Sequence, residues 1–270
     1  MGTLLVSALA LGGMGLLLGV VLTYAGIKFK VEEDPRLAEI MDVLPGANCG
    51  GCGYPGCGGF AQAVLDGKVR PEACPPGGSK SAEAIGKILG IEVDEVLPQK
   101  AFIRCTGSDS LSRSLYIYDG MDRCGAAVQL SHGGAKACSY GCLGLGSCRA
   151  VCVFEAIDIE DGLAKINEKC TACGVCVPVC PKKLIVMVPH DSTVHVACNS
   201  KEPAKTVREK CDVGCIGCRA CIRVCPHEAI LFEDFLATID YEKCTQCLEC
   251  AKKCPTRCIL VKGERPENGK

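Results

Sequence analysis

The chain has 270 residues, a formal net charge of −1, no tryptophan and 25 cysteines. A net charge near zero excludes the basic footprint of a nucleic-acid-binding protein, and a 4% aromatic content leaves few large side chains for an ordinary core. An odd number of cysteines in a long chain with no recognisable cleavable signal does not suit a disulfide framework. We therefore expect reduced, metal-binding thiols in a cytoplasmic setting.

The N-terminal segment predicts a membrane anchor. Leu4 to Ile27 is uncharged and long enough to cross a bilayer of roughly 30 Å as a helix. Its four glycines between positions 12 and 19 favour close packing against partner helices, whereas a dinucleotide-binding loop would need a strand–turn–helix context that is missing here. A signal peptide is the other alternative, but no basic region precedes the run and Lys28 and Lys30 follow it. These lysines predict a single-pass anchor over residues 1–30, with the body on the cytoplasmic side of the cell membrane.

A compact cysteine module is expected over residues 31–95. Val31 to Leu44 is charged and suits a short helix or linker, and Gly59 to Leu65 is expected to be helical. Between them, Pro45 to Cys57 is rich in glycine and proline, which allow the backbone to curl and to direct amides at sulfide. Four cysteines predict a self-contained [4Fe-4S] cluster 1: Cys49, Cys52, Cys57 and Cys74.

Three later runs have the bacterial ferredoxin spacing C-x2-C-x2-C-x3-C-P. They are Cys170, Cys173, Cys176 and Cys180; Cys215, Cys218, Cys221 and Cys225; and Cys244, Cys247, Cys250 and Cys254. In this spacing the first three thiolates bind one cluster and the fourth binds the neighbouring cluster. Zinc sites prefer separated cysteine pairs, often with histidine, and none of the four histidines lies at ligand spacing beside a cysteine pair. The spacing therefore indicates iron–sulfur ligation and electron transfer.

The second half of the chain is an internal repeat. Residues 138–157 align with residues 211–230, and residues 168–181 align with residues 242–255. We expect two tandem ferredoxin-like units of α+β fold, each with two clusters and with short helices after the ligand runs. The units are assigned to residues 100–192 and 193–262, followed by a tail at 263–270. Strands are predicted at Leu163–Ile166, Leu184–Val188, Ala229–Phe232 and Ile259–Val261.

The first ligand run of the repeat is irregular, because Leu145 stands where the second unit has Cys218 and Val153 replaces the proline. Ferredoxin-type crossing predicts cluster 3 from Cys152, Cys170, Cys173 and Cys176; cluster 4 from Cys215, Cys218, Cys221 and Cys254; and cluster 5 from Cys225, Cys244, Cys247 and Cys250. Cluster 2 is assigned to Cys142, Cys148, Cys180 and Cys138, with a nearby extra cysteine as the alternative fourth ligand.

Five cysteines remain. Cys258 is interpreted as a buried small hydrophobe or free thiol. The other four form a sixth cluster in one interpretation and free thiols in the other: Cys105, Cys124, Cys198 and Cys211. An exchange of Cys124 and Cys138 between clusters 2 and 6 stays open. The chain is therefore expected to bind five or six [4Fe-4S] clusters.

The order of these motifs resembles a known family. A membrane anchor, the segment Pro45 to Cys57, the segment Cys138 to Cys148 and the ferredoxin repeats together are similar to the B subunit of the Rnf complex. That complex is a membrane-bound, ion-translocating ferredoxin:NAD+ oxidoreductase. The resemblance implies the longer form with two ferredoxin-like units, and cluster 1 matches the family's near-membrane cluster.

The resemblance also implies a role. The chain would accept electrons from reduced ferredoxin and relay them to membrane subunits and to NAD- or flavin-binding subunits. The sequence has no nucleophile–base pair or phosphate loop, so a complete active site for NAD is not expected on this chain. Basic residues beside the cysteine runs are predicted to dock an acidic ferredoxin, against the alternative of ordinary solvated faces: Lys182, Lys183, Lys252, Lys253 and Arg257.

Two other functions are less favoured. A polyferredoxin-type subunit of a hydrogenase or formate enzyme would need neither the compact module nor the membrane span. A redox sensor that reports through a partner rarely needs so many clusters in series. The sequence therefore favours electron transfer within an ion-translocating complex.

Overall fold

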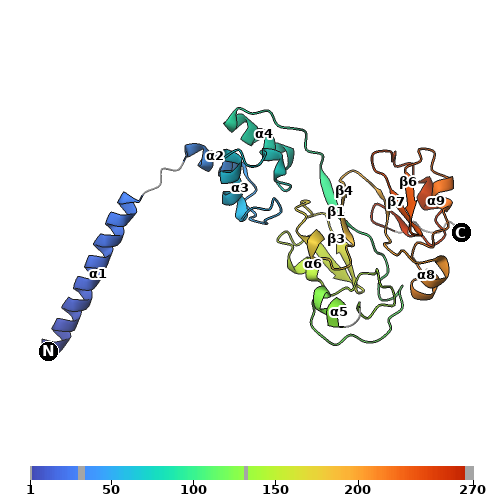
Figure 1. Ribbon diagram of the computed structural model, residues 1–270, viewed down its shortest axis with the longest axis horizontal. Coiled ribbons are helices and arrows are strands. Elements are labelled where there is room, and N and C mark those ends of the chain that lie inside the picture. The colour runs from blue at the N-terminus through green and yellow to red at the C-terminus, as the bar shows by residue number, and fades with distance from the viewer. Residues whose placement is uncertain (1, 30–33, 131–132, 265–270) are drawn as a thin grey trace.

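The computed structural model of the chain describes residues 2–29, 34–130 and 133–264 (Figure 1). Lys30 of the predicted anchor and residues 265–270 of the predicted tail lie outside the described residues. Beyond the N-terminal helix, a small helical body is followed by two bodies that contain the strands. The secondary structure is a mixture of helices and short antiparallel strands, as the α+β prediction requires.

The N-terminal helix α1 (Gly2–Lys28) has 27 residues, which corresponds to a length of about 40 Å. Its segment Leu9–Lys28 has a mean hydropathy of 1.9, and none of it is buried against the rest of the protein. The hydroxyl of Thr23 donates to the carbonyl of Gly19 at 2.8 Å, so this polar side chain is satisfied within the helix. A long apolar helix that is exposed on all sides favours association with a membrane.

The compact module consists of α2 (Pro35–Val43), α3 (Gly56–Leu65), the 3-10 turn η1 (Pro71–Ala73) and α4 (Gly78–Leu89). Asp34 caps α2 by accepting a hydrogen bond from the backbone N–H of Arg36. The core is small, and its largest fully buried side chains are Ile40, Phe60 and Ile85. The helices form a frame around the glycine-rich loop that precedes α3.

In unit 1, two antiparallel strand pairs are nested. The outer pair is β1 (Gln99–Ile103) with β4 (Ile185–Pro189), and the inner pair is β2 (Ile157–Glu160) with β3 (Leu163–Ile166). The buried face of these strands packs on cysteines of the ligand runs. The sheets are therefore built around the sites, and apolar side chains alone do not make the core.

Unit 2 repeats this arrangement. Its outer pair is β5 (Val194–Val196) with β8 (Ile259–Val261), and its inner pair is β6 (Ile230–Glu233) with β7 (Leu236–Ile239). All four predicted strand runs are strands within one residue at each end. Their partner strands β1, β2, β5 and β7 are additional to the prediction.

The short helices lie inside the ligand runs, which corrects the expectation that they follow the runs. Each has four residues and contains the third cysteine of its run: α6 (Ser147–Ala150), α7 (Cys176–Val179), α9 (Ala220–Arg223) and α10 (Glu249–Lys252). The x3 spacing between the third and fourth cysteines accommodates one helical turn. Two longer helices lie outside the runs, α5 (Cys124–Leu130) and α8 (Ala204–Lys210).

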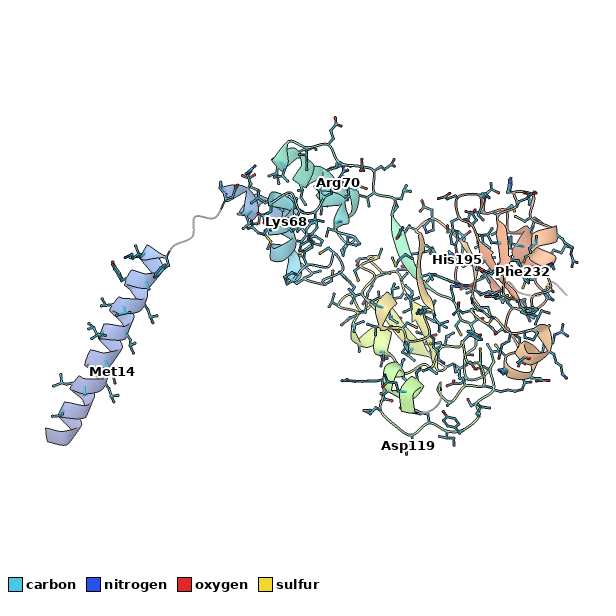
Figure 2. All side chains as sticks on the ribbon, viewed as in Figure 1. Met14, Lys68, Arg70, Asp119, His195 and Phe232 are labelled. Carbon is cyan, nitrogen blue, oxygen red and sulfur yellow. The ribbon has the colours of Figure 1, made fainter. Side chains whose placement is uncertain are left out.

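The two units pack against each other along β1 and β5. The ring of His195 stacks on Phe102 with centroids 4.4 Å apart, and His195 is 2% exposed (Figure 2). Its Nε2 lies 3.0 Å from the carbonyl oxygen of Ser192, which can only accept, so Nε2 carries the proton. Nδ1 then accepts from the hydroxyl of Tyr241 at 2.7 Å. A neutral, fully paired imidazole is thus part of the contact between the units.

Candidate iron–sulfur centres

The loop before α3 brings the four cysteines predicted for cluster 1 to one cavity. Cys49, Cys52, Cys57 and Cys74 all line it. Asn48 adopts a positive φ of 48°, and its side-chain oxygen accepts the backbone N–H of Cys57 at 2.8 Å. This bond closes the loop on itself, so that thiols separated in sequence face the same space. We call this group site 1.

In unit 2 the crossing expected for ferredoxins is present. One cavity, site 4, is lined by Cys215, Cys218, Cys221 and Cys254. A second, site 5, is lined by Cys225, Cys244, Cys247 and Cys250. The fourth cysteine of each run therefore lies with the first three cysteines of the other run.

Cys258 lies beside site 4. It lines the same cavity, is 2% exposed, and its sulfur is 3.6 Å from that of Cys254. Hydrogen bonding from the Cys258 thiol lowers the pKa of Cys254 to about 5. The predicted free thiol is therefore buried, as expected, but it also contacts a candidate ligand.

Site 3 in unit 1 is the set of cysteines predicted for cluster 3: Cys152, Cys170, Cys173 and Cys176. Burial raises the pKa of the Cys173 thiol, and the charges of Cys49 of site 1, Cys152 and Cys170 raise it further. Backbone amides point at two of the sulfurs, since Ala156 donates to Cys152 at 3.3 Å and Ala101 donates to Cys170 at 3.5 Å. Amide hydrogen bonds to sulfur are one of the means by which a protein sets the potential of a cluster.

The structure differs from the sequence assignment at site 2. Its cavity is lined by Cys124, Cys142, Cys148 and Cys180, and Cys138 lies elsewhere. The backbone N–H of Cys124 donates to the Ser147 hydroxyl at 2.8 Å, so the start of α5 is fixed beside the third cysteine of the run. The cavity therefore groups Cys124, and not Cys138, with Cys142, Cys148 and Cys180, which favours the exchange of these two cysteines that the sequence left open.

The repeat contains a signal for this exchange. Cys138 aligns with Cys211 of unit 2, and Cys211 stands outside any ligand run. Because Cys138 is the equivalent of Cys211, we expect that it does not act with the ligand run either. The fourth thiol of site 2 would then come from another segment of the chain. No spacing rule could identify Cys124 as that ligand, because it comes from a separate helix.

The thiols fit polynuclear clusters better than single metal ions. In the described residues, no three cysteine, histidine or acidic side chains converge closely enough to bind one metal ion. Four thiolates around a zinc ion, each at about 2.3 Å, would have to meet nearly at a point. Instead the cysteines surround cavities, as the ligands of an iron–sulfide cage do. Burial raises the pKa of Cys176 to about 12 and of Cys148 to about 11, so metal binding must displace protons from these thiols.

Family models match two parts of the chain. A model for an Fe-S cluster matches residues 44–76, which contain site 1. A model for a 4Fe-4S dicluster domain matches residues 169–229 and 214–258. The first of these dicluster ranges joins ligand runs of different units, whereas the structure groups Cys180 with Cys142 and Cys148 within unit 1.

Three curated relatives match almost the whole chain. The B subunit of the Na(+)-translocating ferredoxin:NAD(+) oxidoreductase complex of Acetobacterium woodii is 45% identical, over 96% of this chain and 78% of the relative. The B subunit of the ion-translocating oxidoreductase complex of Methanosarcina acetivorans is 41% identical, over 97% and 100%. The B subunit of the proton-translocating ferredoxin:NAD(+) oxidoreductase complex of Clostridium ljungdahlii is 41% identical, over 96% and 93%. The chain therefore belongs to the family of B subunits of ion-translocating ferredoxin:NAD+ oxidoreductase complexes, the Rnf complexes.

Proposed function

We propose that this chain receives electrons from reduced ferredoxin at unit 2 and delivers them, through unit 1 and the compact module, to partner subunits at the membrane. As a member of its family the chain is an electron-transfer subunit of an ion-translocating ferredoxin:NAD+ oxidoreductase. When bound, [4Fe-4S] clusters supply one-electron transfer at potentials that the surrounding protein sets. The residues of the chain determine where electrons can enter and leave.

One observation carries the choice of the input end. Of the 25 cysteines, all within the described residues, only Cys218 and Cys247 are exposed. They belong to sites 4 and 5, so both sites of unit 2 reach the protein surface. A soluble electron donor must come close to a ligand thiolate, and the exposed candidate ligands Cys218 and Cys247 both lie in unit 2.

The output end is supported by a contact between the compact module and unit 1. Gly51, in the loop of site 1, lies directly against Cys173 of site 3, and a side chain at position 51 would overlap the Cys173 backbone. Site 1 is also the group nearest in sequence to α1. We therefore place the exit toward membrane partners at site 1.

The proposal includes a single-pass orientation with all the sites on the cytoplasmic side. It is supported by Lys28 at the end of α1 and by the cation–π contact of Lys28 with Tyr24, at 5.8 Å from the ring centroid. Tyrosine and lysine commonly mark the boundary of a membrane span. A periplasmic reporter fused after residue 270 should be inactive, and an active reporter would reverse the orientation.

Charge on unit 2 supports docking of an acidic donor. Lys252 and Lys253 are exposed and adjoin site 5 through α10, although Lys252 is also paired with Glu249 at 2.7 Å. Arg257 follows Cys254 closely. Lys182 is different, because its Nζ donates to the carbonyl of Ser139 at 2.7 Å and it lines site 2; we assign it to the structure of unit 1.

The test is charge reversal on unit 2. The variant with Lys252, Lys253 and Arg257 changed to glutamate should be reduced by ferredoxin several-fold more slowly at low salt, with a much smaller defect at high salt. Lys68→Glu is the matched control, because this exposed lysine lies in the compact module. Equal rates for both variants and the wild type at all salt concentrations would place ferredoxin on another surface.

A further inference from the structure

Unit 1 contains a segment that unit 2 lacks. Between the equivalent cysteines of the repeat, unit 1 has residues 106–137, whereas unit 2 has only residues 199–210. The additional residues include α5, which begins at Cys124 of site 2, and residues 113–123 before it, which we call the insertion loop. The segment that brings Cys124 to site 2 therefore also adds surface to unit 1.

Apolar side chains of the insertion loop are exposed to solvent. Ile117 is 95% exposed, Leu115 is 70% exposed, Met121 is 58% exposed and Tyr116 is 42% exposed. Beyond α1, no other segment of the described residues has so many exposed large apolar side chains so close together. Since soluble proteins rarely leave such a group uncovered, we expect the loop to be buried against a partner when the chain is at work.

The tip of the insertion loop has a definite shape although it is exposed. The hydroxyl of Tyr118 donates to the carbonyl of Met121 at 3.0 Å. The same hydroxyl lies so close to Gly120 that a Cβ at this glycine would be 2.7 Å from it. The tip is therefore closed by a ring that is folded over a turn. A loop that is ordered before binding loses less conformational entropy when a partner covers it.

The base of the insertion loop is attached to both units. The backbone N–H of Arg113 donates to the carbonyl of Lys210 in unit 2 at 2.9 Å, and the carbonyl of Arg113 accepts from the N–H of Ala137 in unit 1 at 2.7 Å. The guanidinium of Arg113 also donates to the carbonyl of Arg208 in unit 2 at 3.1 Å. Because one residue bridges the two units, a partner that binds the loop would also hold the units in this arrangement.

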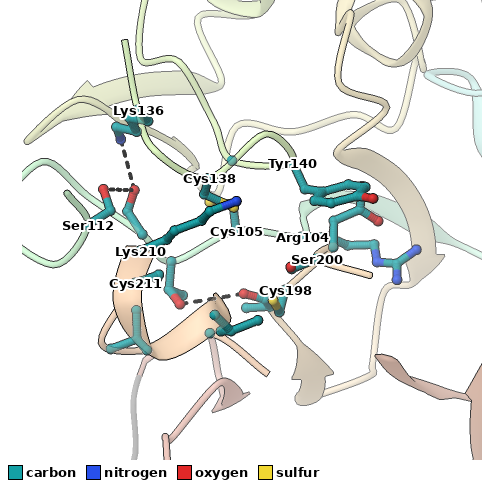
Figure 3. Close-up of a pocket in the computed structure, with 18 of the residues that line it drawn as sticks. Arg104, Cys105, Ser112, Lys136, Cys138, Tyr140, Cys198, Ser200, Lys210 and Cys211 are labelled. Atoms are coloured by element: carbon teal, nitrogen blue, oxygen red, sulfur yellow. Dashed lines mark hydrogen bonds between the residues drawn. The ribbon is translucent and has the colours of Figure 1, made fainter. Parts of the chain in front are cut away.

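The base also adjoins the cavity between the two units (Figure 3). Four cysteines line this cavity: Cys105, Cys138, Cys198 and Cys211. Ser112, the residue before the insertion loop, lines it as well. The Ser112 hydroxyl and the Lys136 ammonium both donate to the carbonyl of Gly107, at 3.4 and 2.8 Å. The loop therefore projects from the packed interface between the units.

Charge on the insertion loop indicates which partner it fits. After its base, the charged side chains of the loop are Asp119, Asp122 and Arg123, and all three are exposed. Such a loop does not attract an acidic ferredoxin or an anionic membrane surface, both of which favour clustered basic side chains. A second copy of the chain offers no comparable exposed apolar group in its described residues outside α1 and the loop itself. Another protein of the complex is the occupant that remains.

We propose that the insertion loop docks this chain onto another subunit of its membrane complex, in an apolar groove with basic side chains at its rim. The relatives of the chain are subunits of such complexes. Docking places the partner beside α5, which begins at site 2, and holds both units through Arg113. The inference deepens the proposed function and rests on it in one respect, that the chain works inside the complex.

Photo-crosslinking in the intact complex tests the occupant. The variant Ile117→benzoylphenylalanine carries the crosslinker at the tip of the loop and should join the full chain to another subunit. Leu97→benzoylphenylalanine is the matched control, because Leu97 is 73% exposed but lies outside the loop, and it should give a much lower yield. Crosslinking of position 117 to lipid, to a second copy of the chain, to ferredoxin or to nothing would overturn the proposal. Equal yields from the two positions would also overturn it, because exposure alone would then explain the product.

Removal of the apolar side chains tests the strength of docking. Burial of one large apolar side chain changes an affinity by roughly tenfold or more. The variant Leu115→Ser/Ile117→Ser should therefore bind roughly 100-fold more weakly, when the full chain is added to complex purified from cells that lack it. The control Ile91→Ser/Leu97→Ser removes exposed apolar side chains elsewhere and should bind as the wild type does. Equal affinities for the two double variants would overturn the proposal.

Reduction by ferredoxin separates this proposal from the proposed function. The isolated full chain with Leu115→Ser/Ile117→Ser should keep its iron and its rate of reduction by ferredoxin, because no cysteine and no residue of unit 2 is changed. A chain that crosslinks to a subunit through position 117 but is not reduced by ferredoxin would contradict the proposed function and leave the docking loop standing. A chain that is reduced normally but crosslinks to no subunit would overturn the docking loop alone.

Discussion

Replacing Gly51 by alanine should separate the compact module from unit 1. A Cβ at Gly51 would overlap the carbonyl oxygen of Cys173 and lie 3.1 Å from its carbonyl carbon. Since non-bonded carbon atoms rest at about 3.5–4.0 Å, the two loops must move apart by on the order of 1 Å. Gly51 does not have a positive φ, so alanine is acceptable to the backbone itself and the perturbation is confined to the contact.

The expected magnitude follows from overpacking. Forcing an extra methyl group into a close contact costs about 1–3 kcal/mol. If the docking contact carries this cost, the ratio of docked to undocked module falls by about 5- to 150-fold. The cost would show in two ways: faster amide exchange across residues 170–176, and slower ferredoxin-dependent NAD+ reduction by the assembled complex. Iron content should be unchanged, because no cysteine is altered.

Gly58→Ala provides the matched control for Gly51→Ala. Gly58 lies in α3 of the same module, without a positive φ, and its Cβ would meet only Met41 Sδ at 4.0 Å. Alanine there should stabilise the helix slightly and leave exchange and electron transfer unchanged. If Gly51→Ala matched this control in both measurements, the contact with Cys173 would not be the junction between the module and unit 1.

Three further predictions concern single side chains. Cys57→Ala should abolish NAD+ reduction by the complex while ferredoxin still bleaches the clusters of both units, and normal NAD+ reduction would exclude site 1 as the exit. Cys258→Ala should keep all iron but lower the reduction potential of the site 4 cluster by about 40 mV, the equivalent of one hydrogen bond of about 1 kcal/mol; an unchanged potential in a redox titration would contradict this. Burial lowers the pKa of His195 from 6.5 to about 4, so its contribution to stability is complete above pH 6.5 and is lost as the pH falls toward 4. Between pH 7 and pH 5 the wild type should therefore lose about 2 kcal/mol relative to His195→Gln, measured by denaturant unfolding, and parallel pH profiles would refute the assignment.

Local spacing is sufficient to predict some elements and insufficient for others. The four apolar runs are recognisable as strands because they follow the ligand runs with strong β propensity. Their partners are not, since β5 has three residues and β1 begins with Gln99 and Lys100. Such short strands carry no period of their own. β1 and β5 are defined by pairing across long sequence separations, as between Ile103 and Ile185, whereas β2 and β7 pair with the predicted strands next to them in sequence.

The same limit applies to the cysteines. Groups whose members share a ligand run are predictable, because a run fixes the distance between its thiols along the backbone. Cys124 and Cys138 lie outside the regular runs, and their sites depend on how α5 packs beside Ser147 and on how the two units meet. The alignment of Cys138 with Cys211 in the repeat is the sequence feature that separates Cys138 from site 2. To use it, the repeat must be applied to cysteines outside the ligand runs as well as to those inside them.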